Sequence, residues 1–179
     1  MIPLLSTLMV LAFGLTVSSA RAQNHAPVPS IAHADFEQYR GEYGQSALCT
    51  TQEITLWSCE TKQRVYSLCS SRTASRTTGY LQYRASNAGK VTFVYPATKV
   101  PPLGLFKYAS SPNGDASIDF TNKGYAYSLG DPLRGKSVIT VSSIAAPGKT
   151  THVACGPNQT LQVNYTMRLM DEFGVWNHD

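Results

Sequence analysis

The sequence predicts a mainly β protein, an antiparallel β-sandwich or barrel of about nine short strands with a short C-terminal helix. Three observations support this prediction. Short runs rich in β-branched and aromatic residues recur roughly every ten residues between residues 53 and 155. Turn residues separate these runs, most clearly in the segment PNGD at 112–115. No segment between the runs has the period of an amphipathic helix, which disfavours a parallel sheet with crossover helices.

The first four predicted strands form two consecutive pairs. Segments EITLWSC (53–59) and RVYSLC (64–69) flank the polar run 60–63, which is expected to form a hairpin loop. In GYLQYRA (79–85), apolar and polar residues alternate, as they do in a strand with one face in the core. The run VTFVY (91–95) follows a turn and ends before a proline, which cannot donate to a strand ladder.

The remaining predicted strands are separated by glycine and proline turns. They are expected at 105–108, 117–120, 124–129, 137–144 and 151–155. Near the C-terminus, LQVNYTMRL alternates as a strand would, but Asn164 could also cap a helix that ends at Gly174. We favour a short helix at about 165–173 over the strand.

The N-terminus has the pattern of an export signal. Residues 2–19 are apolar or small and uncharged, and the small-x-small pattern of Ala20-Arg21-Ala22 follows them. We expect a signal peptide at 1–22, an extended tether at 23–47 and one disulfide-stabilised β domain at 48–179. The alternative, a membrane anchor, is disfavoured because the apolar run is short. The expected location is therefore secreted or periplasmic, with no membrane span in the mature chain.

The cysteine count agrees with an oxidising compartment. All four cysteines follow the leader, and an even number in an exported chain argues for two disulfides. In the predicted first hairpin, Cys59 faces about residue 65 and Cys69 faces about residue 55, so a direct bond between them fits poorly. We favour the pairs Cys49–Cys69 and Cys59–Cys155. The spacing lacks the C-x-x-C pairs of zinc sites.

Motifs for catalysis are absent from the sequence. It contains no G-x-S-x-G elbow, no H-E-x-x-H zinc motif and no glycine-rich phosphate loop. No pair of carboxylates is distinguished as acid and base. We predict no catalytic residue, no metal and no cofactor. His152, the one histidine inside the predicted β region, is the main candidate base if an activity exists.

Charge is distributed unevenly along the chain. The formal net charge is +4, and charged residues make up 15% of the sequence, against about 25% in an average domain. Between residues 61 and 114, however, every charged side chain is Lys or Arg, and tyrosines and phenylalanines lie between them. A basic surface with tyrosines can bind an acidic protein or an anionic head group. The alternative is scattered charge that only solubilises the outer faces of strands.

These observations predict an exported, non-catalytic binding module that uses this basic, tyrosine-bearing surface. The binding residues expected on it are Arg64, Tyr80, Gln82, Arg84 and Lys90. The expected partner is an envelope protein or an anionic glycan or lipid head group. Nucleic acid is disfavoured because the total charge is modest and the chain is exported.

Two other classes of function remain open. The first is an inhibitor or immunity-type partner of an exported hydrolase, which would insert the loop at 131–135 into the cleft of its target. The second is a hydrolase of envelope glycans or esters, for which His152 would be the base.

A resemblance to a known family rests on particular segments. These are CTTQEITLWSCETKQRVYSLCSS with its three ten-spaced cysteines, then GYLQYR, VYP and the closing GVW. Together they resemble a family of uncharacterised exported proteins of proteobacteria. This resemblance implies an exported location and a β-rich fold, and it assigns no catalytic residue. In size, leader and disulfides the chain also resembles periplasmic lysozyme inhibitors in outline, without their motifs.

Overall fold

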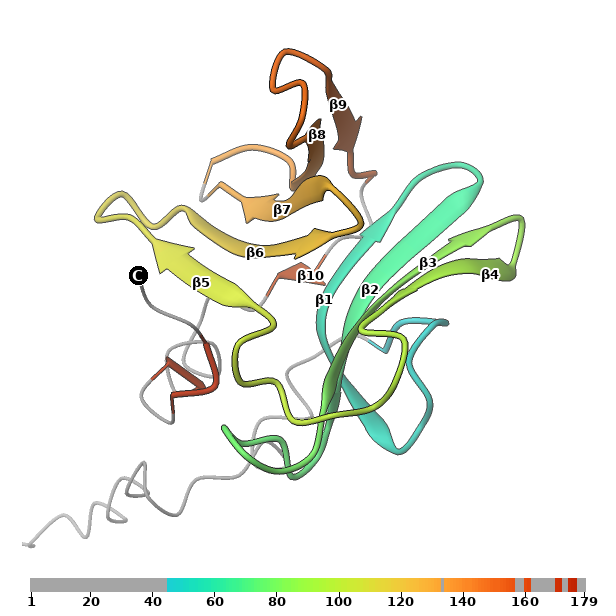
Figure 1. Ribbon diagram of the computed structural model, residues 1–179. Helices are drawn as coiled ribbons and strands as arrows, with labels where there is room; N and C mark the ends of the chain where they lie inside the picture. The colour runs from blue at the N-terminus through green and yellow to red at the C-terminus, as the bar shows by residue number, and fades with distance from the viewer. Residues whose placement is uncertain (1–44, 133, 157–159, 162–169, 172–173, 177–179) are drawn as a thin grey trace, which may run out of the picture.

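Strands make up most of the structure (Figure 1). The computed structural model describes residues 45–132, 134–156, 160–161, 170–171 and 174–176. Its strands are β1 (Glu53–Glu60), β2 (Arg64–Ser71), β3 (Leu81–Asn87), β4 (Lys90–Tyr95), β5 (Lys107–Ser110), β6 (Ala116–Asn122), β7 (Tyr125–Asp131), β8 (Val138–Ser143), β9 (Thr150–Ala154) and β10 (Thr160–Leu161).

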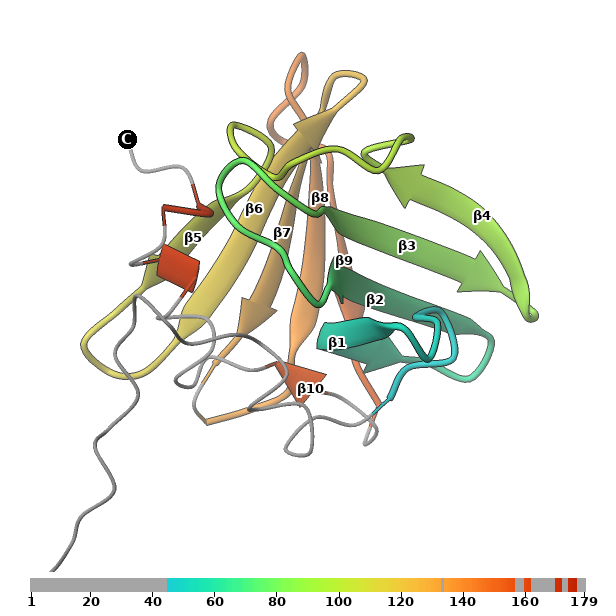
Figure 2. The same cartoon turned by 90° about the horizontal axis from the view of Figure 1, so that it is seen from below.

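The strands form two antiparallel sheets. The first has the order β10-β1-β2-β3-β4 and the second has the order β5-β6-β7-β8-β9. From β1 to β4 and from β5 to β9, neighbours in space are also neighbours in sequence, which is typical of strands joined by short turns. The predicted antiparallel, mainly β fold is thus confirmed. Seen from below, the second sheet lies beside the first in a sandwich-like arrangement (Figure 2).

Strand boundaries differ from the predicted ones where a turn extends further than expected. The strand predicted at 105–108 begins at Lys107, because the backbone N–H of Leu105 bonds the carbonyl of Pro102 at 3.0 Å in a turn. The short strand β10 was not predicted, and it pairs with β1. The helix predicted at about 165–173 lies largely outside the described residues.

Aromatic side chains connect the two sheets. The ring of Tyr83 on β3 lies 5.2 Å from that of Phe120 on β6, and the ring of Tyr95 on β4 stacks on Phe120 at 4.6 Å. Phe120 also stacks on Tyr127 of β7 at 4.7 Å. Aromatic pairs in such geometries contribute about 0.5–1.5 kcal/mol beyond their buried area. The core therefore lies between the sheets, and it extends to Trp57 of β1, which is fully buried.

Both predicted disulfides are confirmed. Cys49 is bonded to Cys69, and Cys59 is bonded to Cys155. In the β1–β2 ladder, Cys59 faces Tyr66 and Cys69 faces Thr55, so the two hairpin cysteines lie too far apart in register to bond to each other. The Cys59–Cys155 bond joins β1 of the first sheet to the end of β9 in the second.

Candidate functional site

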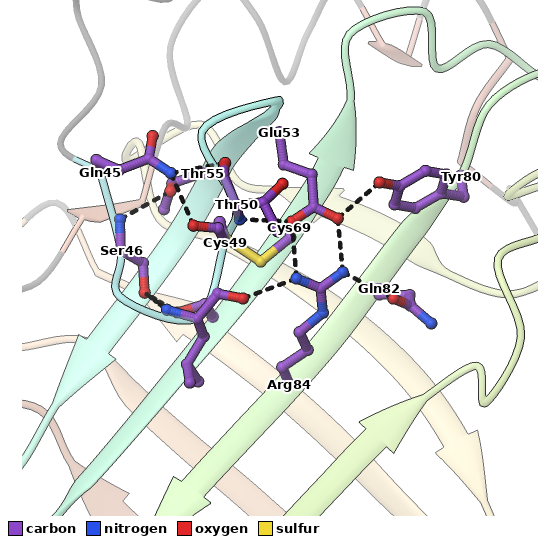
Figure 3. Close-up of a disulfide and its surroundings, with 12 residues drawn as sticks. Gln45, Ser46, Cys49, Thr50, Glu53, Thr55, Cys69, Tyr80, Gln82 and Arg84 are labelled. Carbon is purple, nitrogen blue, oxygen red and sulfur yellow. Dashed lines mark hydrogen bonds and ion pairs between the residues drawn. A yellow bond between two sulfur atoms is a disulfide. The ribbon is translucent and has the colours of Figure 1, made fainter. Parts of the chain in front are cut away.

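Three of the predicted binding residues meet around Glu53 on the first sheet (Figure 3). Arg84 on β3 donates from Nη1 to Glu53 Oε2 at 2.7 Å and from Nη2 to Oε1 at 2.6 Å, which is a bidentate pair. The hydroxyl of Tyr80 donates to Oε1 at 2.6 Å. Gln82 accepts from Arg84 Nη2 at 2.8 Å. The polar face of β3 therefore forms one hydrogen-bonded cluster, which we call the Glu53 cluster.

The segment at 45–52 covers the Glu53 cluster. The carbonyl of Leu48 accepts from Arg84 Nη1 at 2.7 Å, and the backbone N–H of Thr50 donates to Glu53 Oε2 at 2.8 Å. The Cys49–Cys69 disulfide holds this segment on β2 (Figure 3). Because the segment covers the second face of the sheet, β1 is buried on both faces rather than alternating.

Burial corrects the predicted role of two residues. Arg84 is 9% exposed and Gln82 is 4% exposed, so neither contributes to an exposed binding surface. Their polar groups are used inside the protein, since Gln82 also donates to the carbonyl of Pro96 at 2.9 Å. Only the edge of the cluster reaches solvent, where exposed Lys99 lies 4.4 Å from the ring centre of Tyr80 and donates to its hydroxyl at 2.9 Å.

The electrostatics of the Glu53 cluster favour a structural role. Burial by itself would raise the pKa of Glu53, but hydrogen bonds from Arg84, Tyr80 and the backbone of Thr50, with the charge of Arg84, lower it to about 2. Both carboxylate oxygens are occupied by these donors. A general acid or base needs a pKa near the working pH. The Glu53 cluster therefore has the properties of a buried ion pair that fixes a loop.

The other two predicted binding residues lie elsewhere, in a single row of the first sheet. In the ladders, Arg64 of β2 faces Asn87 of β3, and Asn87 faces Lys90 of β4. Residues that face each other across neighbouring strands have side chains on the same side of the sheet. Arg64 and Lys90 are both exposed. This row, which we call the cationic row, ends the first sheet at its hairpin turns.

Next to the cationic row, a cleft opens between the two sheets. In Figures 1 and 2 the β1–β2 and β3–β4 hairpin ends diverge from the β8–β9 hairpin end. The cleft has a volume of about 460 Å³, within the range of about 300–1,000 Å³ that is usual for small-molecule sites. Its lining residues are Arg64, Tyr66, Tyr83, Ala85, Ser86, Asn87, Thr92, Phe93, Tyr127, Ile139, Val141, Thr151 and Val153.

The lining is apolar inside and polar at the mouth. Phe93, Ile139, Val141 and Val153 belong to the hydrophobic core or pack against it. Arg64 is the one charged residue of the lining, and it stands in the cationic row at the end of the sheet. Ligand sites in proteins commonly combine an apolar body with a few placed polar groups.

Three tyrosines bring hydroxyl groups to this cleft. Tyr66, Tyr83 and Tyr127 line it, and their hydroxyls make no hydrogen bond with any other residue that the structure describes. Burial raises the pKa of Tyr83, with smaller contributions from Tyr66 and Tyr127, and burial also raises the pKa of Tyr127. The hydroxyls of Tyr83 and Tyr127 are therefore neutral donors and acceptors at physiological pH. None of the three hydroxyls is among the fully buried atoms that lack a partner, so a ligand or water that enters the cleft can bond to them.

The cleft could not be predicted from the sequence, although Arg64, one of the predicted binding residues, lines it. Arg64 and Lys90 were predicted as binding residues, whereas the tyrosines of the lining were treated only as residues interleaved with the charges. The available signal was a spacing of two residues. Arg64 and Tyr66 on β2, and Tyr83 and Ala85 on β3, are each two residues apart, which places each pair on one face of its strand. The opposing wall comes from β7 to β9, and no local pattern links those strands to β2.

Residues tied to the alternative functions lie apart from the cleft lining. His152 is exposed on β9, and its Nδ1 lies 3.1 Å from the hydroxyl of Thr140. No carboxylate contacts His152 among the described residues, so the third member of a nucleophile–base–acid arrangement is missing there. In the loop at 131–135, Asp131 accepts a hydrogen bond from Ser137, and residue 133 is not described. Burial raises the pKa of Asp131.

The described ranges contain neither a metal-binding cluster nor a membrane-spanning helix. In that part of the chain, no group of three or more His, Cys, Asp or Glu side chains could hold a metal ion. None of the described segments forms a helix that is both long and apolar enough to span a bilayer. Comparison with known proteins found no matching family model, no matching curated protein and no matching solved structure.

Proposed function

We propose that this protein is an exported, non-catalytic binding module whose ligand site is the cleft between the two sheets. The ligand is a small molecule with an apolar body. The observation that carries the proposal is the lining of the cleft, in which core side chains such as Phe93 and Val141 stand beside tyrosine hydroxyls that have no partner among the described residues. Apolar area that a ligand covers contributes about 25 cal/mol per Å² to binding.

The proposed location follows from the covalent chemistry. Two disulfides that use all four cysteines are typical of proteins from oxidising compartments. The uncharged apolar segment at 2–19 and the small residues after it favour export by a signal peptide. A binding module in the envelope or outside the cell accords with both features.

A neutral fluorescent dye tests the proposed site. Phenylnaphthylamine carries no charge, and its emission rises when water no longer surrounds it. We expect saturable binding to the oxidised protein. Replacing Val141, a half-buried residue of the lining on β8, by Trp fills the cleft and should weaken binding by about tenfold or more, the equivalent of about 1.4 kcal/mol.

Val91→Trp is the matched control. Val91 lies on β4, is 47% exposed and is not part of the lining, so this variant adds the same ring at a site outside the cleft. It should bind the dye as the original protein does. Circular dichroism should show the same β spectrum for both variants. If the original protein fails to bind the dye, or if Val141→Trp binds it unchanged, the cleft is not the ligand site.

A further inference from the structure

We infer that the cleft ligand is an anionic single-chain amphiphile, with its acyl chain between the sheets and its acidic head group beside Arg64 and Lys90. This inference rests on the proposed function and specifies its ligand. The observation behind it is the position of the cationic row, which continues the same face of the first sheet that forms the apolar wall of the cleft.

The register of the first sheet establishes that continuity. Along β2, Arg64 and Tyr66 are two residues apart, so both side chains lie on the cleft face. Along β3, the same holds for Asn87 and Ala85. The row formed by Tyr66 and Ala85 lies directly inward of the row formed by Arg64 and Asn87, so apolar and cationic groups follow one another on one surface.

A bulge brings Lys90 onto the same face. In the β3–β4 ladder, Ala85 faces Phe93, whereas Asn87 faces Lys90, so the register shifts by one residue between Ala85 and Ser86. Phe93 and Lys90 are three residues apart, and without this bulge their side chains would lie on opposite faces. With the bulge, Lys90 stands in the same row as Arg64 and Asn87, next to the lining residues of the cleft although it is not one of them.

No opposing charge neutralises the cationic row within the lining. The lining contains no Asp or Glu. The nearest acidic residue along the chain, Glu60, faces Val65 in the β1–β2 ladder, and Val65 is on the opposite face from Arg64. Two exposed cations at one end of a cleft whose lining is otherwise uncharged attract an anion, and an Arg–carboxylate pair adds bidentate geometry.

The composition of the cleft decides between classes of ligand. A free inorganic anion would use the cationic row and leave the apolar walls uncovered, whereas a neutral hydrocarbon would leave the two cations without a partner. A neutral sugar would place its hydroxyls against Ile139 and Val153, at the cost of their hydration. An acyl chain with a terminal carboxylate or phosphate matches both regions at once. Tyr66, in the first row inward, is the closest hydroxyl donor in register.

A chain-length series measures the apolar part of the site. Hexanoate, octanoate and decanoate are titrated against the protein with bound phenylnaphthylamine, and displacement of the dye gives each affinity. Each added methylene should tighten binding about fourfold, the equivalent of about 0.8 kcal/mol. In Val141→Trp, where dye binding is itself weakened, decanoate binding is followed directly by titration calorimetry and should be lost. Decanoate that fails to displace the dye, or affinity independent of chain length, would overturn the inferred acyl site.

A head-group series measures the polar part. Decanoate should bind more tightly than decanol or decylammonium, whose chains have the same length. Removing both cations in Arg64→Ala/Lys90→Ala should abolish the preference, so that decanoate binds this variant no more tightly than decanol does. The control Lys62→Ala/Arg134→Ala removes two cations from exposed positions outside the lining and should keep the preference for decanoate.

The outcomes separate the inference from the proposed function. If phenylnaphthylamine binds in the cleft but decanoate and decanol bind equally, the anionic head group is wrong and the binding function stands. If the preference for decanoate survives the loss of Arg64 and Lys90, the cationic row is not the head-group site. If the dye itself fails to bind, the proposed function is wrong and the inference fails with it.

Discussion

Glu53 illustrates how two opposite effects act on a single side chain. Burial disfavours its charge, while a bidentate partner and two further donors stabilise it. The charge of Arg84, its partner 31 residues away in the sequence, is likewise compensated by Glu53. Breaking a buried pair by removing one partner leaves the other charge in the interior without compensation.

Replacing Glu53 by Gln should therefore destabilise the protein strongly. We expect the free energy of unfolding to fall by about 3–5 kcal/mol, because Arg84 remains buried without a counter-ion. Denaturant unfolding with the disulfides intact measures it. Lys99→Ala is the control, since Lys99 is an exposed partner of the same carboxylate at 3.4 Å and should cost less than about 1 kcal/mol. Equal losses in the two variants would contradict this account.

The same residue predicts how stability depends on pH. The pKa of Glu53 is about 2 in the folded protein, below its ordinary value of 4.5, so the unfolded chain binds the proton more tightly. The stabilisation is complete above the unfolded pKa and is lost as the pH falls from 4.5 towards 2. Across this window the original protein should lose stability more steeply than Glu53→Gln. Parallel curves would show that Glu53 is not the titrating group.

Individual residues also show which features could be predicted from the sequence and which could not. Arg64 and Arg84 are the same residue type in the same basic segment, yet one is exposed at the cleft and the other is buried against Glu53. The alternation of polar and apolar residues in β3 correctly placed Arg84 and Gln82 on the face of the sheet opposite to Tyr83. What covers the polar face could not be predicted, because the cover is a segment of irregular structure at 45–52 that is held by a distant disulfide.

At the scale of elements, turn residues determined where strands could be predicted. Glycine and proline signals placed nearly every strand from β1 to β9, since these residues interrupt the ladder wherever they occur. A bulge carries no such signal. The shift between Ala85 and Ser86 changes which face of β4 carries Lys90, and nothing in the sequence KVTFVY marks it.

The turn before β3 makes a specific prediction about Gly79. Its φ is +64°, and an added Cβ would lie 2.2 Å from the hydroxyl of Ser71 and 2.8 Å from the Cα of Ala74. That hydroxyl accepts a hydrogen bond from the N–H of Tyr80 at 3.0 Å. Gly79→Ala should therefore cost more than the roughly 1–3 kcal/mol of backbone strain alone, as measured by denaturant unfolding.

Gly89 in the β3–β4 turn provides the comparison. Its φ of +78° is similar, but nothing lies within 4 Å of an added Cβ. Gly89→Ala should show the cost of strain without the steric overlap, so its loss should be the smaller of the two. A loss at Gly89 that equals or exceeds the loss at Gly79 would contradict the close approach of the Ser71–Ala74 segment.

At the scale of the whole molecule, the two disulfides close loops of different length. The Cys59–Cys155 bond spans 96 residues and the Cys49–Cys69 bond spans 20. Loop-closure entropy predicts stabilisation of about 4–5 kcal/mol for the longer loop and about 3 kcal/mol for the shorter one. Paired Cys→Ala replacements and denaturant unfolding should therefore give the larger loss for the longer loop. The reverse order would show that folded-state contacts, rather than chain entropy, set the ranking.

The Cys59–Cys155 bond also fixes the spacing of the two cleft walls. In the β1–β2 ladder Cys59 faces Tyr66, a residue of the cleft lining, and the bond ties this row to the end of β9 in the second sheet. At the β4–β6 side, the stacked rings of Tyr95 and Phe120 connect the sheets without a covalent bond. Reduction of the disulfide would therefore remove the one side-chain covalent link between the sheets among the described residues. A ligand bound at the proposed site should then exchange faster.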